Sequence, residues 1–159
     1  MKKVLIALDF DPSSVKVAEK GHALAKAMGA KIVLMHVLYE PVYYSSLEYS
    51  PIVGFNDYAN LGALQTDTIQ GLKEAAQSFL DKTKHHLADE NIQTLLKEGD
   101  TADTILEAAK DIKADIIVLG THSRKWLENI LMGSIAEKVL KNSTMPLFII
   151  PTKKQDDKK

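Results

Sequence analysis

The sequence predicts an α/β fold, a doubly wound parallel sheet of five strands with helices on both faces. Short, continuous apolar runs alternate with segments of helical periodicity, which is the pattern of parallel strands buried on both faces. The chain has 159 residues, of which 45% are hydrophobic, enough for one domain with a sizeable core. It contains no cysteine, so disulfides, thiolate metal sites and cysteine nucleophiles are excluded.

The first strand and helix follow from the pattern at the N-terminus. Residues 4–8 are a buried apolar run that ends at Asp9. Pro12, Ser13 and Ser14 are typical of a helix start, and Gly29 of a helix end. The apolar face predicted between them consists of Val15, Ala18, His22, Ala25 and Met28 or Ala27. Residues 31–37 are a second buried run.

The middle of the chain is less regular. From Tyr39 to about Thr66 the periodicity dissolves into a long loop rich in aromatic residues. Its tyrosines could cover a bound base, or could pack on the sheet edge or on a second subunit. A helix is predicted from about Thr66 to Leu87. Residues 91–98 form a third, more polar strand, which we expect near an edge of the sheet.

The last third of the chain returns to the alternation of helix and strand. After Gly99 a helix begins for which Thr101 is the favoured N-cap, with Asp103 or Thr104 as alternatives. Its predicted inner face holds Ile105, Ala108 and Ala109. A strand over 115–119, a helix over 134–141 with the apolar residues Ile135, Val139 and Leu140, and a strand over 147–150 between two prolines complete the pattern.

The carboxyl ends of the predicted strands indicate where a ligand would bind. Asp9, Val37, Gly99 and Gly120 all lie at such ends, so they should gather on one edge. In Rossmann-like and flavodoxin-like sheets, ligands bind outside the carboxyl ends at the switch point in strand order.

The segment from Gly120 onward carries the strongest functional pattern. A small-residue turn, Gly120 to Ser123, follows the fourth strand, and after nine intervening residues Gly133-Ser134 opens the next helix. Such a turn and helix start can present backbone N–H groups to an anion. A plain tight turn and helix cap is the alternative. The P-loop motif and the dinucleotide-binding glycine motif are both missing, which removes the ordinary P-loop hydrolase and dehydrogenase interpretations.

This spacing resembles the ATP-binding type of universal stress protein, whose motif is G-x2-G-x9-G-[ST]. Here the motif reads Gly120-x2-Ser123-x9-Gly133-Ser134. Residues 4–9, 135–140 and 145–150 are also similar to the family, and the similarity covers nearly the whole chain. The chain departs from the motif at Ser123, which replaces its second glycine. Serine resists a positive φ more than glycine does, so binding of ATP depends on the backbone at this position.

The resemblance implies an adenine nucleotide site. Asp9 would contact the ribose or adenine, Ala7 and Leu8 would line the base pocket, and Val37 would contact adenine through its backbone. The remaining implied nucleotide-binding residues are Leu119, Gly120, His122, Ser123, Gly133, Ser134 and Ile135. Any Mg²⁺ would be held through the nucleotide phosphates, without a metal site of the protein. From the residues alone, Asp9 could equally form an Asx turn or cap the next helix, His36 is a satisfied core histidine, and His122 is either a phosphate contact or an exposed turn residue.

The function implied is binding of ATP as a regulatory ligand in stress response, with little or no hydrolysis. No residue is placed as a general base, and no arginine stands at a motif position. The alternative is a nucleotide-free dimeric interaction module of the same family. The family pairs the last strands of two subunits, which here predicts a homodimer through Leu147, Phe148, Ile149 and Ile150.

Net charge and hydropathy argue against nucleic acid and membranes as partners. The formal net charge of −1 offers no electrostatic case for nucleic acid or an anionic membrane. No apolar run approaches the roughly 20 residues of a membrane span, and none at the N-terminus suits a signal peptide, so a cytoplasmic protein is expected. We expect residues 1–152 to form a single nucleotide-binding domain and residues 153–159 a charged tail.

Overall fold

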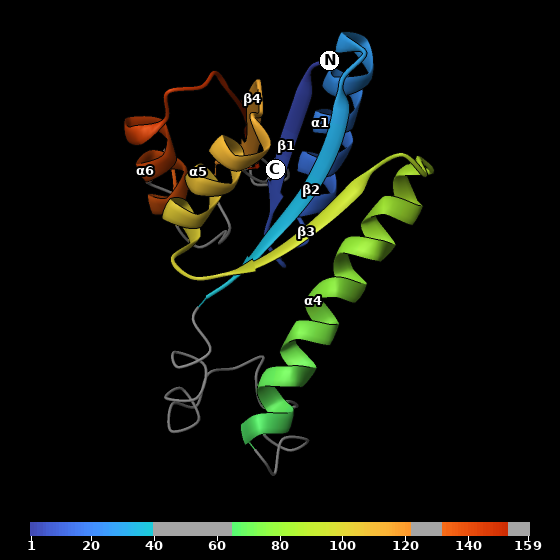
Figure 1. The fold of residues 1–159 in the computed structure, drawn as a ribbon, viewed down its shortest axis with the longest axis vertical. Helices are drawn as coiled ribbons and strands as arrows, with labels where there is room; N and C mark the ends of the chain where they lie inside the picture. Colours follow the sequence, from blue (N-terminus) through green and yellow to red (C-terminus); the bar gives the residue numbers. More distant parts are fainter. Residues whose placement is uncertain (40–64, 122–131, 153–159) are drawn as a thin grey trace, which may run out of the picture.

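The computed structural model describes residues 1–39, 65–121 and 132–152, and it consists of strands and helices in alternation (Figure 1). The strands are β1 (Lys3–Leu8), β2 (Lys31–Leu38), β3 (Gln93–Glu98), β4 (Ile116–Gly120) and β5 (Leu147–Ile150). The helices are α1 (Ser14–Met28), α4 (Gln65–Leu87), α5 (Thr101–Ile112) and α6 (Ser134–Asn142).

The five strands form one parallel sheet in the order β3-β2-β1-β4-β5. This confirms the predicted fold class, and it puts β3 at an edge, as its polarity predicted. The helices α1 and α4 cover one face, and α5 and α6 cover the other (Figure 1). The order reverses between β1 and β4, so the switch point lies at their carboxyl ends.

The core has two layers because successive side chains of a buried strand point to opposite faces. Leu5, Met35 and Ile117 pack toward α5 and α6. Ile6, Leu34 and Val118, which directly follow or precede them along the strands, pack toward α1 and α4. Each of these six side chains is fully buried. The apolar runs of β1, β2 and β4 are continuous because these strands have no solvent face.

Helix α1 packs through a face that only partly overlaps the predicted one, since Ala18 and Ala25 are buried as expected. Its buried residues are Ser14, Val17, Ala18, Gly21 and Ala25, whereas Val15 is 47% exposed. The close approach to the sheet is the reason, because a Cβ at Gly21 would lie 2.8 Å from Cδ1 of Ile6. Small residues let the helix approach the sheet, and the branched Val15 is left outside. The predicted stop at Gly29 is confirmed, since this glycine caps the helix with a left-handed φ of 65°.

On the other face of the sheet, the structure corrects the predicted N-cap of α5 and the predicted inner face of α6. The N-cap of α5 is Asp100, whose carboxylate accepts a hydrogen bond from the Asp103 backbone N–H at 3.0 Å, and not Thr101. Both residues suit a cap, but Asp100 has the extended backbone that an N-cap requires. In α6, Val139 is buried as its periodicity suggested, while Ile135 and Leu140 are exposed and Ala136 takes the inner position.

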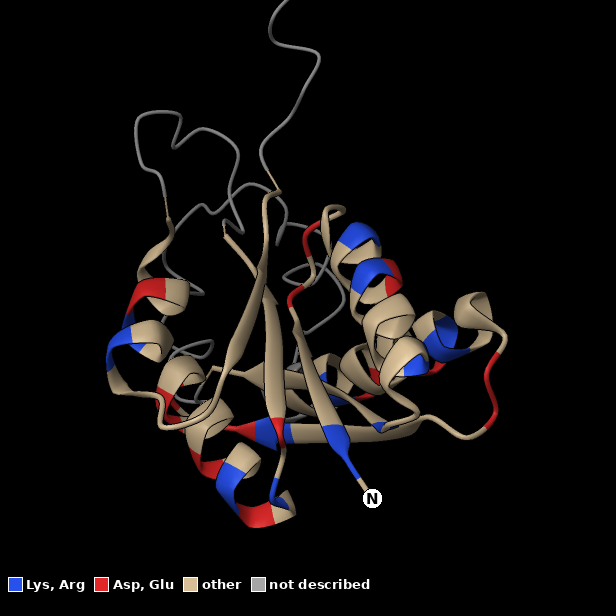
Figure 2. Ribbon diagram, turned by 90° about the horizontal axis from the view of Figure 1, so that it is seen from above, with Lys and Arg blue, Asp and Glu red and all other residues tan. Residues whose placement is uncertain are grey.

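Charged residues of both signs are interspersed along the helices, and the strands carry few of them (Figure 2). Within residues 1–39, 65–121 and 132–152, no helix combines the length and the apolar content that a membrane span needs.

Candidate functional site

A cleft lies at the carboxyl ends of β1 and β4, which is the switch point of the sheet. Its floor comes from the ends of these two strands, and its walls come from the first residues of α1, α5 and α6. The lining residues are Ala7, Leu8, Asp9, Ser13, Ser14, Val17, Thr101, Ile105, Leu119, Gly120, Thr121, Gly133, Ser134, Ile135 and Ala136.

Three helices therefore begin at this cleft and direct their N-termini toward it. The first backbone N–H groups of a helix lack intrahelical partners, and the helix dipole favours negative charge there. Asp100 caps α5, but neither Ser13 of α1 nor Gly133 of α6 makes a side-chain cap hydrogen bond. The first backbone N–H groups of α1 already donate to carbonyl oxygens of the preceding turn, so the arrangement suits an anionic group placed against the start of α6.

Asp9 is the one acidic residue among the described residues that line the cleft. Its Oδ1 accepts a hydrogen bond from the Asp11 N–H at 2.9 Å, so the predicted Asx turn is present. Burial raises the pKa of Asp9 to about 6, while the hydrogen bond from Asp11 opposes that rise and the Asp11 charge adds to it. At neutral pH the carboxylate is ionised, and it can accept hydrogen bonds from hydroxyl or amino groups of a ligand.

Asp11 organises the start of α1 beside Asp9. Its Oδ2 accepts hydrogen bonds from the backbone N–H of Ser13 at 3.0 Å and from the Ser13 hydroxyl at 2.5 Å. These contacts hold Ser13 and Ser14 at the rim of the cleft.

The other wall is built around the end of β4. A Cβ at Gly120 would lie 2.8 Å from Cγ2 of Thr152 and 3.0 Å from Cγ2 of Val17, so the close packing of three segments requires glycine. The Thr121 N–H donates to the carbonyl oxygen of Ile150 at 3.0 Å, and the Gly133 N–H donates to that of Thr121 at 2.5 Å. These bonds hold the start of α6 against the end of β4.

The structure brings together eight of the residues predicted for a nucleotide site. They are Ala7, Leu8, Asp9, Leu119, Gly120, Gly133, Ser134 and Ile135. Val37 does not line the cleft, because it is buried in the core beneath α5. Gly99 is likewise absent from the lining, two strands away from β1. His122 and Ser123 lie outside the described residues.

Several hydroxyl groups at the cleft were not predicted from the sequence. The pattern indicates Ser13, Ser14 and Thr101 as helix-start residues only, and Thr121 as part of a turn. All of them line the cleft. A signal for them exists in the sequence, because in a parallel sheet the helix after each strand begins at the carboxyl edge.

His36 stabilises the strand end beneath Asp9. Its Nδ1 lies 2.7 Å from the Leu8 carbonyl oxygen, and since that oxygen only accepts, Nδ1 carries the proton. The ring centroid is 4.4 Å from that of Phe10 and 5.8 Å from that of Phe79. The imidazole is buried, as the interpretation of a satisfied core histidine predicted, and burial lowers its pKa.

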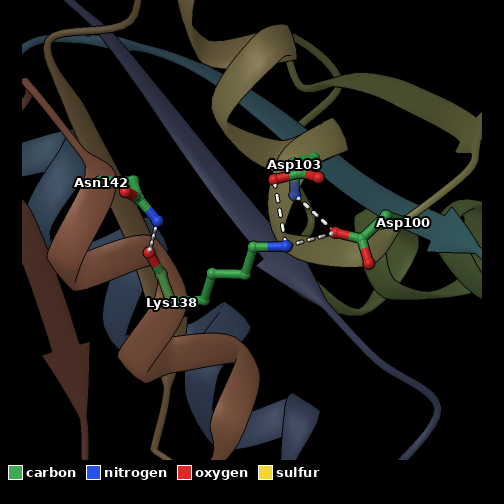
Figure 3. A network of polar contacts seen from close by, with 4 residues as sticks. All are labelled: Asp100, Asp103, Lys138 and Asn142. Atoms are coloured by element: carbon green, nitrogen blue, oxygen red, sulfur yellow. Dashed lines mark hydrogen bonds and ion pairs between the residues drawn. The ribbon is translucent and has the colours of Figure 1, made fainter.

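A polar network joins the helices on the other side of the cleft (Figure 3). The Lys138 ammonium lies 3.3 Å from Oδ2 of Asp100 and 3.3 Å from Oδ1 of Asp103. The Lys138 carbonyl oxygen accepts a hydrogen bond from the Asn142 side chain at 2.9 Å. The part of the chain that the structure describes contains no group of three potential metal ligands.

Comparison with known proteins gives a consistent result. Residues 1–151 match the model of the universal stress protein family. Universal stress protein MJ0531 of Methanocaldococcus jannaschii is 32% identical over 158 residues, covering 98% of this chain and 85% of that protein. Universal stress protein YxiE of Bacillus subtilis is 27% identical over 154 residues, covering 93% of this chain and 97% of that protein.

Solved structures agree with the fold. The structure of protein MJ0577 of Methanocaldococcus jannaschii has a TM-score of 0.74 at 24% identity and covers 97% of this chain and 98% of that chain. A universal stress protein crystallised in complex with cAMP has a TM-score of 0.65 at 18% identity and covers 95% of this chain and 97% of that chain.

Proposed function

This chain belongs to the universal stress protein family, and on that premise we propose that it binds ATP as a regulatory ligand in stress response, with little or no hydrolysis. The observation that carries the proposal is the cleft between β1 and β4, which combines a carboxylate with the N-termini of three helices. A universal stress protein of the same fold has been crystallised with an adenine nucleotide, cAMP, which supports this class of ligand. Residues 1–152 would act as one nucleotide-binding domain.

Each wall of the cleft suits one part of the nucleotide. The Asp9 carboxylate, at the end of β1, would accept hydrogen bonds from the ribose hydroxyls, with Ala7 and Leu8 toward the base. Gly120, Gly133 and Ser134 would border the phosphates. The Gly133 N–H already donates to Thr121, so the donors to phosphate oxygens would be the Ser134 hydroxyl and the N–H groups of the first turn of α6. Any Mg²⁺ would be bound by those phosphates. The backbone of Val37 and the side chains of His122 and Ser123 stay predicted contacts.

Slow turnover follows from the chemistry of the lining. Asp9 is the sole ionisable side chain among the described residues that line the cleft, and it is assigned to the ribose. No described lysine or arginine lines the cleft to neutralise a leaving group. The nucleotide would then remain bound as a ligand, and its presence would alter what the protein contacts.

Calorimetric titration with Mg-ATP tests the site directly. We expect heat of binding from the unsubstituted chain and a loss of at least tenfold in affinity for Gly133→Val, whose side chain would cover the start of α6. The backbone at Gly133 has φ −69°, which valine adopts without strain, so the variant should fold. Gly71→Ala, on α4, is the control and should bind normally. Equal heats from the unsubstituted chain and Gly133→Val would contradict the proposed phosphate site.

Two further measurements separate the proposal from its alternatives. Mass spectrometry of gently purified protein should reveal co-purified ATP or AMP, whereas a nucleotide-free interaction module would carry none. Phosphate release should be far slower than binding; rapid stoichiometric hydrolysis would contradict the ligand role.

The same reasoning extends to a homodimer through β5. This strand pairs with β4 on one side and stands at the edge of the sheet, where unpaired backbone groups invite pairing with a second copy. Phe148 is 37% exposed on it. Light scattering at micromolar concentration should give twice the monomer mass for the unsubstituted chain. For Phe148→Lys it should give the mass of the monomer. A monomer in the unsubstituted chain would exclude the dimer.

A further inference from the structure

Two carboxylates stand at the start of α5, directly beside the cleft. Asp100 caps the helix, Thr101 follows it in the cleft wall, and Asp103 lies in the same first turn. Acidic residues at a helix N-terminus stabilise the helix because they complement its dipole. At a cleft for phosphates the same residues are unfavourable, because their field repels a polyanion.

Lys138, on α6, pairs with both carboxylates and offsets one of their two negative charges. Its ammonium lies 3.3 Å from a carboxylate oxygen of each residue, in a fork that Figure 3 shows spanning α6 and α5. Among the described residues no other lysine or arginine pairs with Asp100 or Asp103. Lys138 is one helical turn beyond Ser134, which lines the cleft, so the Cα atoms of the two residues are about 6 Å apart along the helix axis.

We propose that Lys138 is a specificity-determining residue, which lets the cleft favour a highly charged nucleotide over a weakly charged one by offsetting part of the negative charge of Asp100 and Asp103. This inference rests on the proposed function and deepens it. The residue touches no ligand and acts through the field at the phosphate end. Its contribution should increase with the number of phosphates, and it should weaken as salt screens the charges.

A charge series tests the inference. The affinities of adenosine, AMP and ATP are measured for the unsubstituted chain, Lys138→Met and Lys138→Arg at low and high salt. Lys138→Met keeps most of the aliphatic stem and removes the charge. At low salt it should weaken ATP roughly three- to tenfold, AMP less, and adenosine by less than about twofold. Lys138→Arg should retain the discrimination, and high salt should reduce the loss for ATP.

Two matched variants separate charge from structure. Lys141→Met removes a lysine from the same helix, but this lysine pairs with Glu137 at 3.7 Å and lies farther from the cleft, so the effect on ATP should be smaller. Adding Asp100→Asn and Asp103→Asn to Lys138→Met removes the uncompensated carboxylates while Asn keeps the cap, and it should restore ATP affinity.

The possible results distinguish this role from the proposed function. An equal loss for adenosine, AMP and ATP, or no loss for ATP at low salt, would overturn the role of Lys138 and leave the proposed function standing. Absence of nucleotide binding by the unsubstituted chain would overturn both. Loss graded by ligand charge, together with rescue by the double Asn substitution, would support both.

Discussion

His36 holds the end of β1 through a hydrogen bond of 2.7 Å from its Nδ1 to the carbonyl oxygen of Leu8. The two residues are paired in register across neighbouring strands, and Leu8 directly precedes Asp9. A core side chain of β2 therefore braces the strand end from which the candidate ligand contact projects.

Replacing this histidine should destabilise the protein in a pH-dependent way. His36→Phe keeps an aromatic ring but loses the hydrogen bond, and the free energy of unfolding should fall by about 1–3 kcal/mol at pH 7 to 8. Because burial lowers the pKa of His36, its neutral form contributes stability above about pH 6.5. That contribution is lost as the pH falls through the lower pKa of the folded state.

Urea unfolding from pH 5 to pH 8 measures both effects. The difference in stability between the unsubstituted chain and His36→Phe should shrink toward acid pH. His85→Gln, an exposed position on α4, is the control and should change little. A constant difference across the pH range would argue against a buried neutral imidazole.

Asp9→Asn should stabilise the protein at neutral pH. Burial raises the pKa of Asp9 to about 6, above its ordinary value of about 3.9, so ionisation costs the folded state. In the unsubstituted chain, the contribution of protonated Asp9 to the stability of the folded state is complete below about pH 4 and is lost as the pH rises through about 6. Asparagine keeps the acceptor for the Asp11 N–H and avoids the charge. The gain above pH 7 should not exceed about 3 kcal/mol.

The check is urea unfolding from pH 4 to pH 8, paired with nucleotide titration. The stability curves of Asp9→Asn and the unsubstituted chain should converge toward pH 4, and the variant should lose ligand affinity. Parallel curves would contradict the raised pKa, and undiminished affinity would contradict the ribose contact.

Gly120→Ala should be destabilising through overpacking. The new methyl group would meet Thr152 and Val17 at 3.0 Å or less, so the free energy of unfolding should fall by about 1–3 kcal/mol. Gly71→Ala is a matched control, because no atom lies within 4 Å of its Cβ and alanine favours a helix. That control should gain up to about 1 kcal/mol. Thermal or urea unfolding distinguishes the two, and equal effects would refute the packing argument.

Lys113→Gly should stabilise the end of α5. Lys113 caps this helix with a left-handed backbone at φ 58°, which is unfavourable for a side chain with a Cβ. Glycine relieves that cost and loses some conformational entropy on folding, for a net gain of about 0.5–1 kcal/mol. Lys110→Gly, in the last helical turn, should instead lose about 1 kcal/mol. A loss at both positions in urea unfolding would contradict a backbone cost at Lys113.

The fold was predictable because parallel strands are apolar on both faces, and short continuous apolar runs such as residues 4–8 and 116–119 match that environment. That Asp9, Gly120 and Gly133 lie close together followed from the rule that the carboxyl ends of parallel strands share one edge of the sheet. The inner face of α1 was not predictable from periodicity alone. Two sets of residues fit one face of a helix equally well, namely 15, 18, 22 and 25, and 14, 17, 18, 21 and 25. Close packing at Gly21 decided between them.

The rest of the site depended on three-dimensional details that spacing does not encode. Asp100 and Thr101 are both good caps, so the hydroxyl at the cleft could not be told from the capping carboxylate. Val37 ends an apolar strand and its side chain lies in the core, so its predicted backbone contact with adenine stays a prediction. The ion pairs of Lys138 with Asp100 and Asp103 link residues that are far apart in the sequence, and no sequence motif predicts them.

The pairing of β1 with β4 also sets when the cleft can exist during synthesis. The Lys3 N–H donates to the Asp115 carboxylate at 2.8 Å across a sequence separation of 112 residues. The sheet thus closes at its centre only after most of the chain has been made, and such long-range pairing forms slowly. Until then the emerging polypeptide exposes the apolar edge of β1 and has no ligand site. A ligand that binds this cleft would therefore be captured only by chains that have closed the sheet, and it would stabilise the closed sheet by mass action.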